Sequence, residues 1–281
     1  MENILISNPR KLEKLKKSIS KDGVKKLHIL ADFDRTMTRA FINGENTPSF
    51  ISILRNGNYL TSDYVRRARN LYTKFHPIEI NSKVPPEDKK KAMNEWWTTH
   101  FDLLIKSGLN KKDLEKVVES NKIKLRDGAS EFIDFLYNHN IPLVIMSSSG
   151  LGGDIISMFL KKERKIHNNI YIVSNSYEWD KNGNAVNVKK PIIHVMNKNE
   201  TVVKNLPFFN VIKNKKNIIL LGDNLEDIRM VEGFTYDNLI KIGFLNESIK
   251  ENLKQYKLNY DVVLLNDSSM DYINNLLRSL F

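Results

Sequence analysis

Short apolar runs that end in polar residues are the feature that most limits how this chain can fold. The runs are 27–34, 141–147, 169–174, 217–223, 239–244 and 261–265. Each run is too short for a buried helix, so the pattern predicts buried β-strands. Segments with helical periodicity lie between several of them, at 128–140, 153–164 and 224–233. Strands that alternate with helices predict an α/β fold with a doubly wound, mostly parallel sheet.

A long insertion separates the first predicted strand from the helix at 128–140. It spans roughly 80 residues without a convincing buried strand, which is too long for a loop. Helical periodicity runs through 61–75, 86–108 and 110–120. We therefore expect a core formed by residues 1–44 and 124–281, with a helical cap at 45–123.

Local signals support this division of the chain. Asp63 and Asn110 are candidate N-caps, and Pro86 fits the first turn of a helix. Asn43–Gly44 and Pro48 mark a first hinge into the cap, and 121–127 would form the second. Further along, the DKNGN turn at 180–184 predicts a β-hairpin attached to the sheet.

Composition excludes several classes of protein. The 281 residues carry a net charge of +11, are 41% hydrophobic and include no cysteine, which excludes a disordered chain, disulfide scaffolds, thiolate zinc sites and thiol nucleophiles. No run approaches ~18 apolar residues and the N-terminus lacks an apolar leader, so we expect a soluble, cytoplasmic protein with no membrane partner. The lysines are scattered among acids, which favours a solvated surface or a field for small phosphorylated anions over nucleic-acid binding.

Acidic and hydroxyl side chains gather where the predicted strands end. Asp32 and Asp34 stand two apart in extended backbone, so both face one side while Phe33 faces the other. Ligands of open α/β sheets bind beyond the carboxyl ends of the strands. The other candidates at this edge are Ser147, Ser148, Ser149, Asp223 and Asp227.

Acids gathered in this way need a cation, and Mg²⁺ suits an all-oxygen set. With a phosphate-binding turn beside them, they predict phosphoryl transfer: Asp32 attacks phosphorus, and Asp34 protonates the leaving oxygen and then activates water. Aspartates at strand ends are also common as turn and cap residues, which would be the better explanation of an isolated D-x-D.

The motifs resemble those of the haloacid-dehalogenase superfamily of phosphatases, and in more detail the pyrimidine 5′-nucleotidase family, cytosolic 5′-nucleotidase type III. The resemblance covers roughly residues 27–275, in matching order. The matching segments are ADFDRTMTR (31–39), EWWTTHFDLL (95–104), IPLVIMSSSGLGGDI (141–155), IIHVMNKNE (192–200), NIILLGDNLEDIRMVEG (217–233) and LIKIGFLNE (239–247). A shared order and a shared cap make this match more specific than the superfamily motifs alone.

The resemblance implies roles for individual residues. Asp32 would be the nucleophile and Asp34 the acid and base, with Mg²⁺ held by Asp32, the backbone carbonyl of Asp34, and Asp223. Asp227 would orient the metal ligands or their waters. Lys198 would touch both the nucleophile and the phosphate, as a point charge that offsets crowded carboxylates.

The serine motif departs from the family pattern by one extra small residue. Counting forward from Pro142 makes Ser147 the phosphate ligand, whereas counting back from the GLG turn makes it Ser148. We favour Ser148, with Ser149 in the slot that usually holds alanine. The N-terminus of the next helix offers backbone N–H groups to an anion in either case.

Two cap residues match positions near the base. Glu79 matches a glutamate that reads the base; its carboxylate would accept from the amino group of cytosine or 7-methylguanine and suits uracil less well. An ordinary loop glutamate is the alternative. His100 stands where the family has a small hydroxyl residue, and a core or rim histidine is its alternative. Candidate stacking rings are Phe41, Tyr64, Phe75, Trp96 and Trp97.

The sequence therefore predicts a monomeric, Mg²⁺-dependent 5′-nucleotidase that prefers the pyrimidine nucleotides CMP and UMP. Its partner would be a small-molecule nucleotide. The alternatives are a phosphatase for another small phosphomonoester, such as a sugar phosphate or phosphoserine, or a catalytically silent basic binding module.

Overall fold

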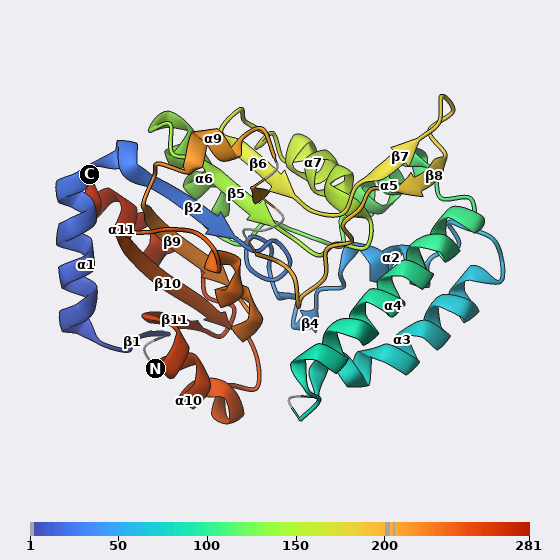
Figure 1. Cartoon of the computed structure of the whole chain (residues 1–281), viewed down its shortest axis with the longest axis horizontal. Helices are drawn as coiled ribbons and strands as arrows, with labels where there is room; N and C mark the ends of the chain where they lie inside the picture. Colours follow the sequence, from blue (N-terminus) through green and yellow to red (C-terminus); the bar gives the residue numbers. More distant parts are fainter. Residues whose placement is uncertain (1–2, 82, 200–202, 205) are drawn as a thin grey trace.

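The core of the computed structural model is a seven-stranded sheet in the order β1-β11-β10-β9-β2-β5-β6 (Figure 1). The structure describes residues 3–81, 83–199, 203–204 and 206–281. The strands that match the apolar runs are β2 (Leu27–Ala31), β5 (Leu143–Met146), β6 (Ile170–Val173), β9 (Asn217–Gly222), β10 (Asn238–Leu245) and β11 (Val262–Leu265). They pair in parallel, which confirms the predicted fold class.

One strand is added that the sequence did not reveal. β1 (Ile4–Ile6) pairs antiparallel with β11 at the edge of the sheet. Ile4 and Ile6 are each 39% exposed, so this short strand lacks the buried apolar run by which the others are recognised.

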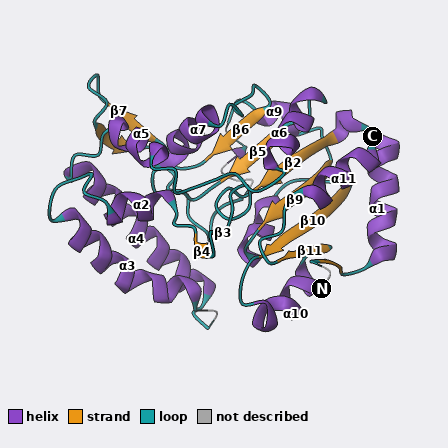
Figure 2. Cartoon of the chain, turned by 180° about the vertical axis from the view of Figure 1, so that it is seen from behind, coloured by secondary structure: helices purple, strands orange, loops and turns teal. Residues whose placement is uncertain are grey.

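Helices cover both faces of the sheet, as Figure 2 shows. Side chains of β2 alternate between two buried clusters, Ile29 and Ala31 on one face and Leu30 on the other. The covering helices are α1 (Pro9–Asp22), α6 (Ala129–Asn138), α7 (Gly152–Lys162), α9 (Phe209–Ile212), α10 (Ile249–Asn259) and α11 (Asp271–Leu280). The helix predicted at 224–233 is a 3₁₀ helix, η2 (Leu225–Val231), and a second one, η1 (Val24–Lys26), leads into β2.

The insertion after β2 is helical, as predicted. We call α2 (Phe50–Asn56), α3 (Tyr64–Ile80), α4 (Pro86–Lys106) and α5 (Lys111–Glu119) the helical insert. A small hairpin of β3 (Phe41–Ile42) and β4 (Glu45–Asn46) precedes it. In Figure 1 the insert lies at the end of the molecule opposite α1, and the strand arrows of β2 and β5 point toward it.

The predicted helix signals are confirmed in part. Pro86 lies in the first turn of α4, and Asn110 forms a capping box with Asp113 at the start of α5. Asp63 occupies the N-cap position of α3 without capping it, because its carboxylate accepts from Thr61 and Arg67 instead.

The two chain segments that join insert and core run side by side. Thr38 bridges to Leu125, and the Arg39 N–H donates to the Lys124 carbonyl at 3.0 Å. Arg126 lies beside them, 2% exposed, and donates to the Thr36 carbonyl at 2.8 Å. The proposed boundaries at 44/45 and 123/124 remain a prediction.

The hairpin of β7 (Tyr177–Trp179) and β8 (Ala185–Val188) is confirmed, but its predicted attachment to the sheet is wrong. It forms a separate two-stranded sheet. The Ala185 N–H donates to the Leu109 carbonyl at 2.8 Å, and Asn184 bridges to Asn110. The hairpin therefore uses its backbone groups to join the helical insert rather than the central sheet. No helix among the described residues is long and apolar enough to span a membrane.

Candidate active site

Asp32 and Asp223 follow directly after two neighbouring parallel strands, β2 and β9. The Asp32 N–H continues the ladder by donating to the Leu221 carbonyl at 2.9 Å. Asp227, in η2, completes a cluster in which carboxylate oxygens of the three residues lie within 4.8 Å of one another. The topology thus brings together acids that are almost 200 residues apart in the chain, as expected for strand ends at one sheet edge.

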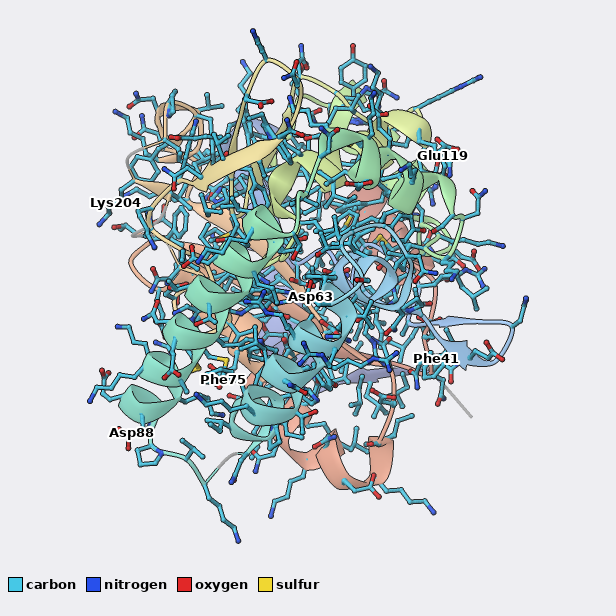
Figure 3. All side chains as sticks on the ribbon, turned by 90° about the vertical axis from the view of Figure 1, so that its right-hand side faces the viewer. Phe41, Asp63, Phe75, Asp88, Glu119 and Lys204 are labelled. Carbon is cyan, nitrogen blue, oxygen red and sulfur yellow. The ribbon has the colours of Figure 1, made fainter. Side chains whose placement is uncertain are left out.

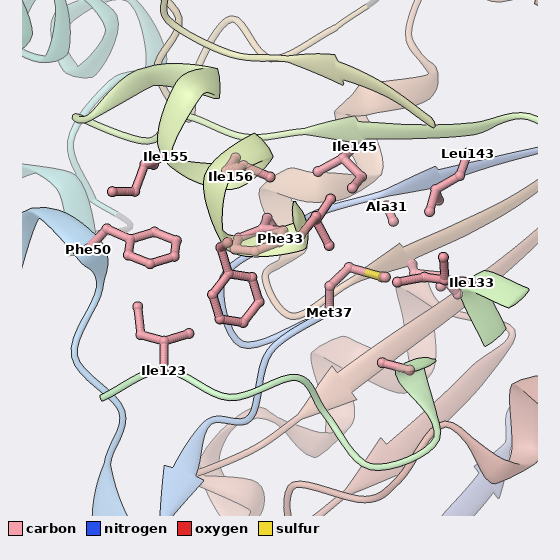
Figure 4. Packing of buried hydrophobic residues seen from close by; sticks show 14 of the residues in the cluster. Ala31, Phe33, Met37, Phe50, Ile123, Ile133, Leu143, Ile145, Ile155 and Ile156 are labelled. Carbon is pink, nitrogen blue, oxygen red and sulfur yellow. The ribbon is translucent and has the colours of Figure 1, made fainter. Parts of the chain in front are cut away.

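The residue between the first two aspartates points the other way. Phe33 is fully buried in the apolar cluster drawn in Figure 4, stacked on Phe50 with ring centroids 6.0 Å apart. Phe33 therefore faces away from the acidic cluster, as expected, while Asp34 is half-buried in the turn that follows and its charge acts on Asp32. Because Phe50 belongs to α2, this core also ties the helical insert to the catalytic edge.

Lys198 is buried among these acids. Its ammonium donates to Asp32 and to Asp227, the latter at 2.8 Å, and the lysine is 5% exposed. The other carboxylate oxygen of Asp227 accepts from the backbone N–H groups of Asp223 and Asn224 at 3.1 and 3.0 Å. Asp227 is thereby fixed on both sides, by the lysine and by the turn after β9.

Burial and crowding raise the pKa of the carboxyl groups. Desolvation raises the pKa of Asp32 to about 7 against the opposing charge of Lys198, and the charges of Asp227 and Asp34 raise it further. Desolvation also raises the pKa of Asp34 to about 6. The pKa of Asp223 lies well above its usual range through desolvation and repulsion from Asp32 and Asp227. Burial lowers the pKa of Lys198, but Asp227 and Asp32 outweigh it and keep the lysine charged.

These residues fit a hard divalent cation. One ammonium cannot neutralise three crowded carboxylates, and the donors are all oxygens. A cation among Asp32 and Asp223 would remove the repulsion that now favours their protonated forms. The acidic cluster predicted from the motifs is therefore assembled by the fold.

The serine loop, residues 147–151, lies between β5 and α7. Ser147 and Ser149 are 1% and 9% exposed and their hydroxyls hold the turn together: Ser147 Oγ accepts from the Ser149 N–H at 3.1 Å, and Ser149 Oγ from the Leu151 N–H at 3.3 Å. Ser148 is the more accessible of the three. The loop leads into the N-terminus of α7, where Gly152 has a φ of +76°.

A row of aromatic rings crosses the helical insert beside the serine loop. Phe75, Trp96, Trp97 and His100 follow one another with centroids 5.4–5.9 Å apart and nearly parallel planes. Figure 3, viewed from the insert, shows Phe75 on α3. The row touches the serine loop and the segment that leads to Lys198: a methyl group on Gly150 would lie 2.6 Å from the Trp97 ring, and Met196 packs with Phe75 and Trp96.

The predicted base-reading residues lie in and near this row. Glu79, one turn after Phe75, is partly exposed and hydrogen-bonds His76 at 3.0 Å. His100 is 2% exposed; its Nε2 pairs with the Tyr64 hydroxyl at 3.1 Å, and burial lowers its pKa to about 4. Among the described residues, the Nδ1 of His100 and the Nε1 of Trp96 are buried and find no hydrogen-bond partner. Phe41 lies apart, under the Arg35 guanidinium.

Three buried polar residues at this edge escaped the sequence analysis. Asn175 bonds both the serine loop and Ile193, His194 pairs with Asn94 of α4 at 3.2 Å, and Arg126 holds the backbone after Asp34. Asn175 could have been found, because it follows β6 at the same edge as the other candidates. Nothing in the local pattern marks His194 or Arg126, whose partners are distant in the chain.

The sheet order and the acidic edge define a phosphatase of the haloacid-dehalogenase fold. A phosphoserine phosphatase structure, a phospho-aspartyl intermediate analogue, shares this fold at 17% identity with a TM-score of 0.52, covering 89% of this chain and 97% of that one. The crystal structure of cytosolic 5′-nucleotidase IIIB bound to cytidine is far more similar, with a TM-score of 0.91 and 27% identity over 100% of this chain and 94% of that one.

The chain belongs to the pyrimidine 5′-nucleotidase (UMPH-1) family, whose model matches residues 35–281. The 7-methylguanosine phosphate-specific 5′-nucleotidase A of Xenopus laevis is 36% identical over 99% of this chain and 95% of its own length. The human 7-methylguanosine phosphate-specific 5′-nucleotidase is 34% identical over 98% and 91%. The protein is thus a 5′-nucleotidase, a phosphoric monoester hydrolase, which confirms the predicted family and enzyme class.

Proposed function

We propose that this protein hydrolyses pyrimidine nucleoside 5′-monophosphates to nucleoside and phosphate, with Mg²⁺ and through a phosphorylated Asp32. The observation that carries the proposal is the placement of Asp32, which is buried, held by Lys198 and set beside Asp223 and Asp227. A nucleophile so placed faces an anionic substrate across a site that can supply positive charge.

The reaction has two displacements at phosphorus. In the first, a carboxylate oxygen of Asp32 forms a bond to phosphorus as the bond to the 5′-oxygen breaks, and Asp34 gives that oxygen its proton. In the second, Asp34 takes a proton from water, whose oxygen displaces Asp32 and releases phosphate. The raised pKa of Asp34, about 6, suits a group that must both give and accept a proton near neutrality.

The metal would be held by Asp32, the backbone carbonyl of Asp34, and Asp223. When bound, it would neutralise charge between the attacking and phosphoryl oxygens. Asp227 would orient the metal ligands rather than bind the metal itself, since its oxygens already accept from Lys198 and from the backbone N–H groups of Asp223 and Asn224. Lys198 would hold the nucleophile and offset the phosphoryl charge.

The phosphate would bind at the serine loop. We propose Ser148 as the hydroxyl ligand because it is the more accessible serine, while the oxygens of Ser147 and Ser149 accept hydrogen bonds within the turn. Both of these serines can still donate a hydroxyl hydrogen to phosphate. The first two N–H groups of α7, expected from the sequence to bind the anion, are already used: Gly152 donates to the Ser149 carbonyl at 3.1 Å and Gly153 to the Asn175 carbonyl at 2.8 Å.

The helical insert would read the base. Glu79, at the end of α3 near the aromatic row, would accept from an exocyclic amino group, which favours cytosine over uracil. His100 would affect base binding indirectly, because it stacks on Trp97 and holds that ring in place. The same carboxylate suits 7-methylguanine, and the names of the relatives make 7-methylguanosine 5′-monophosphate the second candidate substrate.

Other features belong to the same proposal. We expect residues 45–123 to act as a cap that closes over the site, excluding water during the first step. The protein would work as a monomer in the cytoplasm, in keeping with a Caenorhabditis elegans relative named a putative cytosolic 5′-nucleotidase 3.

A substrate panel tests the proposal. Phosphate release with Mg²⁺ is measured for CMP, UMP, 7-methyl-GMP, AMP and a sugar phosphate. We expect CMP and 7-methyl-GMP to be hydrolysed best, and Glu79→Gln to lower kcat/KM for both while leaving the sugar phosphate unchanged. The matched control is Glu95→Gln, an exposed glutamate of the insert paired with Lys74. Equal rates for all phosphomonoesters would reject the nucleotide preference and leave the phosphatase chemistry standing.

A further inference from the structure

The segment after β6 lies between the serine loop and the segment that leads to Lys198, both of which we propose to act on the phosphate. Asn175, in this segment, is 1% exposed. Its Nδ2 donates to the Ser149 carbonyl at 3.2 Å and to the Ile193 carbonyl at 2.9 Å, and its Oδ1 accepts from the Ile193 N–H at 2.8 Å. A single side chain therefore joins the serine loop to the segment that leads to Lys198.

The fit on the serine side is close. The Asn175 carbonyl accepts from the Gly153 N–H at 2.8 Å, and a Cβ on Gly152 would lie 2.7 Å from the same oxygen. Nearby, the Tyr177 hydroxyl donates to the Gly150 carbonyl at 2.7 Å. Asn175 and Tyr177 thus hold the carbonyls of Ser149 and Gly150 from outside the serine loop.

The segment before Lys198, residues 192–197, folds into a turn, and Asn175 binds the beginning of this turn at Ile193. Asn197 donates to the Ile192 carbonyl at 2.8 Å and accepts from the His194 N–H at 2.8 Å. Ile193 lies between these contacts, and both of its backbone polar groups pair with Asn175. Because Asn197 is hydrogen-bonded to Ile192 and His194, fixing the position of Ile193 also fixes the backbone position of Lys198.

We propose that Asn175 is a positioning residue that sets the separation between the phosphate-binding serines and Lys198. The inference rests on the proposed function, in which both groups act on one phosphate. The asparagine itself touches neither nucleophile nor substrate in this account. Its amide is suited to the task because two N–H donors and one acceptor are used together, a combination that serine and alanine lack. Displacement of a catalytic group by about 1 Å costs on the order of a hundredfold in rate.

The test compares Asn175→Ala and Asn175→Ser with a matched control, Asn169→Ala. Asn169 is also buried and lies just before the other end of β6, where its Nδ2 donates to the Ile141 carbonyl at 2.8 Å. We expect kcat/KM for CMP to fall about tenfold to a hundredfold in both Asn175 variants. In Asn169→Ala it should stay within about threefold of wild type, even if the melting temperature falls as much.

A double-mutant cycle separates positioning from general damage to the fold. In a Lys198→Ala background, Asn175→Ala should cost less than about threefold, because the lysine that it positions is gone. Loss by the same large factor in both backgrounds would overturn the inference. If Asn175→Ala does not fold, the same cycle is run with Asn175→Ser.

Asp32→Asn and the two Asn175 variants, measured together, distinguish the positioning role of Asn175 from the proposed mechanism. Wild-type activity on CMP that is lost in Asp32→Asn but unchanged in both Asn175 variants would reject only the role of Asn175. Activity that survives Asp32→Asn would reject the proposed mechanism, and with it the basis of this role.

Discussion

The ammonium of Lys198 and the carboxylate of Asp227 lie 2.8 Å apart, both buried, at the carboxyl edge of the central sheet. The same ammonium also donates to Asp32. A lysine shared in this way links the proposed nucleophile to the acid that holds the turn after β9. Within the cluster of Asp32, Asp223 and Asp227, a bound cation would offset the carboxylate charge that this ammonium does not.

Lys198→Ala should reduce kcat for CMP by about a hundredfold to a thousandfold, because it removes the fixed positive charge that faces the reacting phosphoryl group. The control is Lys162→Ala: Lys162 donates to the Val118 carbonyl and to Asn121, away from the acidic cluster. Steady-state phosphate release measures both. Equal activity of the two variants would remove Lys198 from the mechanism.

Mg²⁺ should stabilise the protein more at pH 8 than at pH 5.5. The pKa values of Asp32 (about 7) and Asp34 (about 6) are raised above that of a free carboxyl, 3.8. Without a cation, the folded state therefore holds protons that the unfolded state has lost, and this stabilisation disappears as pH rises through 6 to 7. A cation must displace those protons, so its binding strengthens over the same range.

Melting temperatures with Mg²⁺ and with a chelator, taken at both pH values, measure this effect. Asp223→Asn should abolish most of the difference, because it removes a carboxylate from the cluster. A Mg²⁺-dependent shift of equal size at pH 5.5 and pH 8 would contradict the coupling.

Gly150→Ala should lower kcat/KM about tenfold or more, because the new methyl group would lie 2.6 Å from the Trp97 ring and would force the insert and the serine loop apart. Gly153→Ala is the control, since its methyl group would lie 3.2 Å from the Ile172 side chain and 3.7 Å from the Ser174 side chain, away from the insert. If the contact is the cause, Trp97→Leu in the Gly150→Ala background should recover part of kcat/KM relative to Trp97→Leu alone. If kcat/KM does not recover, the contact between residue 150 and Trp97 is not the cause of the loss.

Arg126→Met should destabilise the fold by about 3–5 kcal/mol, as expected when one partner of a buried ion pair is removed. Arg126 pairs with Asp267 at 2.8 Å and covers the Phe244 ring at 4.1 Å. Arg39→Met is the control, because Arg39 and Asp127 form an exposed pair for which about 1 kcal/mol or less is expected. Urea unfolding compares the two variants, and similar losses of stability would show that the buried Arg126–Asp267 pair contributes no more than the exposed one.

The sheet could be predicted because its strands are buried on both faces, so that β2 and β9 read as nearly continuous apolar runs, LHILA and NIILLG. β1 could not, since its isoleucines stay partly exposed and only pairing with β11 makes it a strand. The hairpin of β7 and β8 was recognised from its turn, but its partner is the insert, which local sequence does not encode.

The acidic cluster could be predicted for a similar reason, because strand ends are forced to one edge. Asp32 and Asp223 follow from that rule and Asp227 lies one turn beyond, while Lys198 needed the family resemblance in a chain rich in lysine. Which serine binds phosphate stays a prediction, to which the folded loop adds that Ser148 is more accessible than Ser147 and Ser149. Asn175 acts through backbone groups of residues that the sequence keeps apart.

The central claim is that Asp32 carries the phosphoryl group between the two steps. The most direct measurement is acid quenching of the enzyme during turnover of CMP with Mg²⁺, followed by peptide mass spectrometry. We predict a phosphoryl adduct on the peptide that contains Asp32, absent from Asp32→Asn and from enzyme quenched without substrate. Turnover at full rate with no adduct on Asp32, or with the adduct on another residue, would contradict the account.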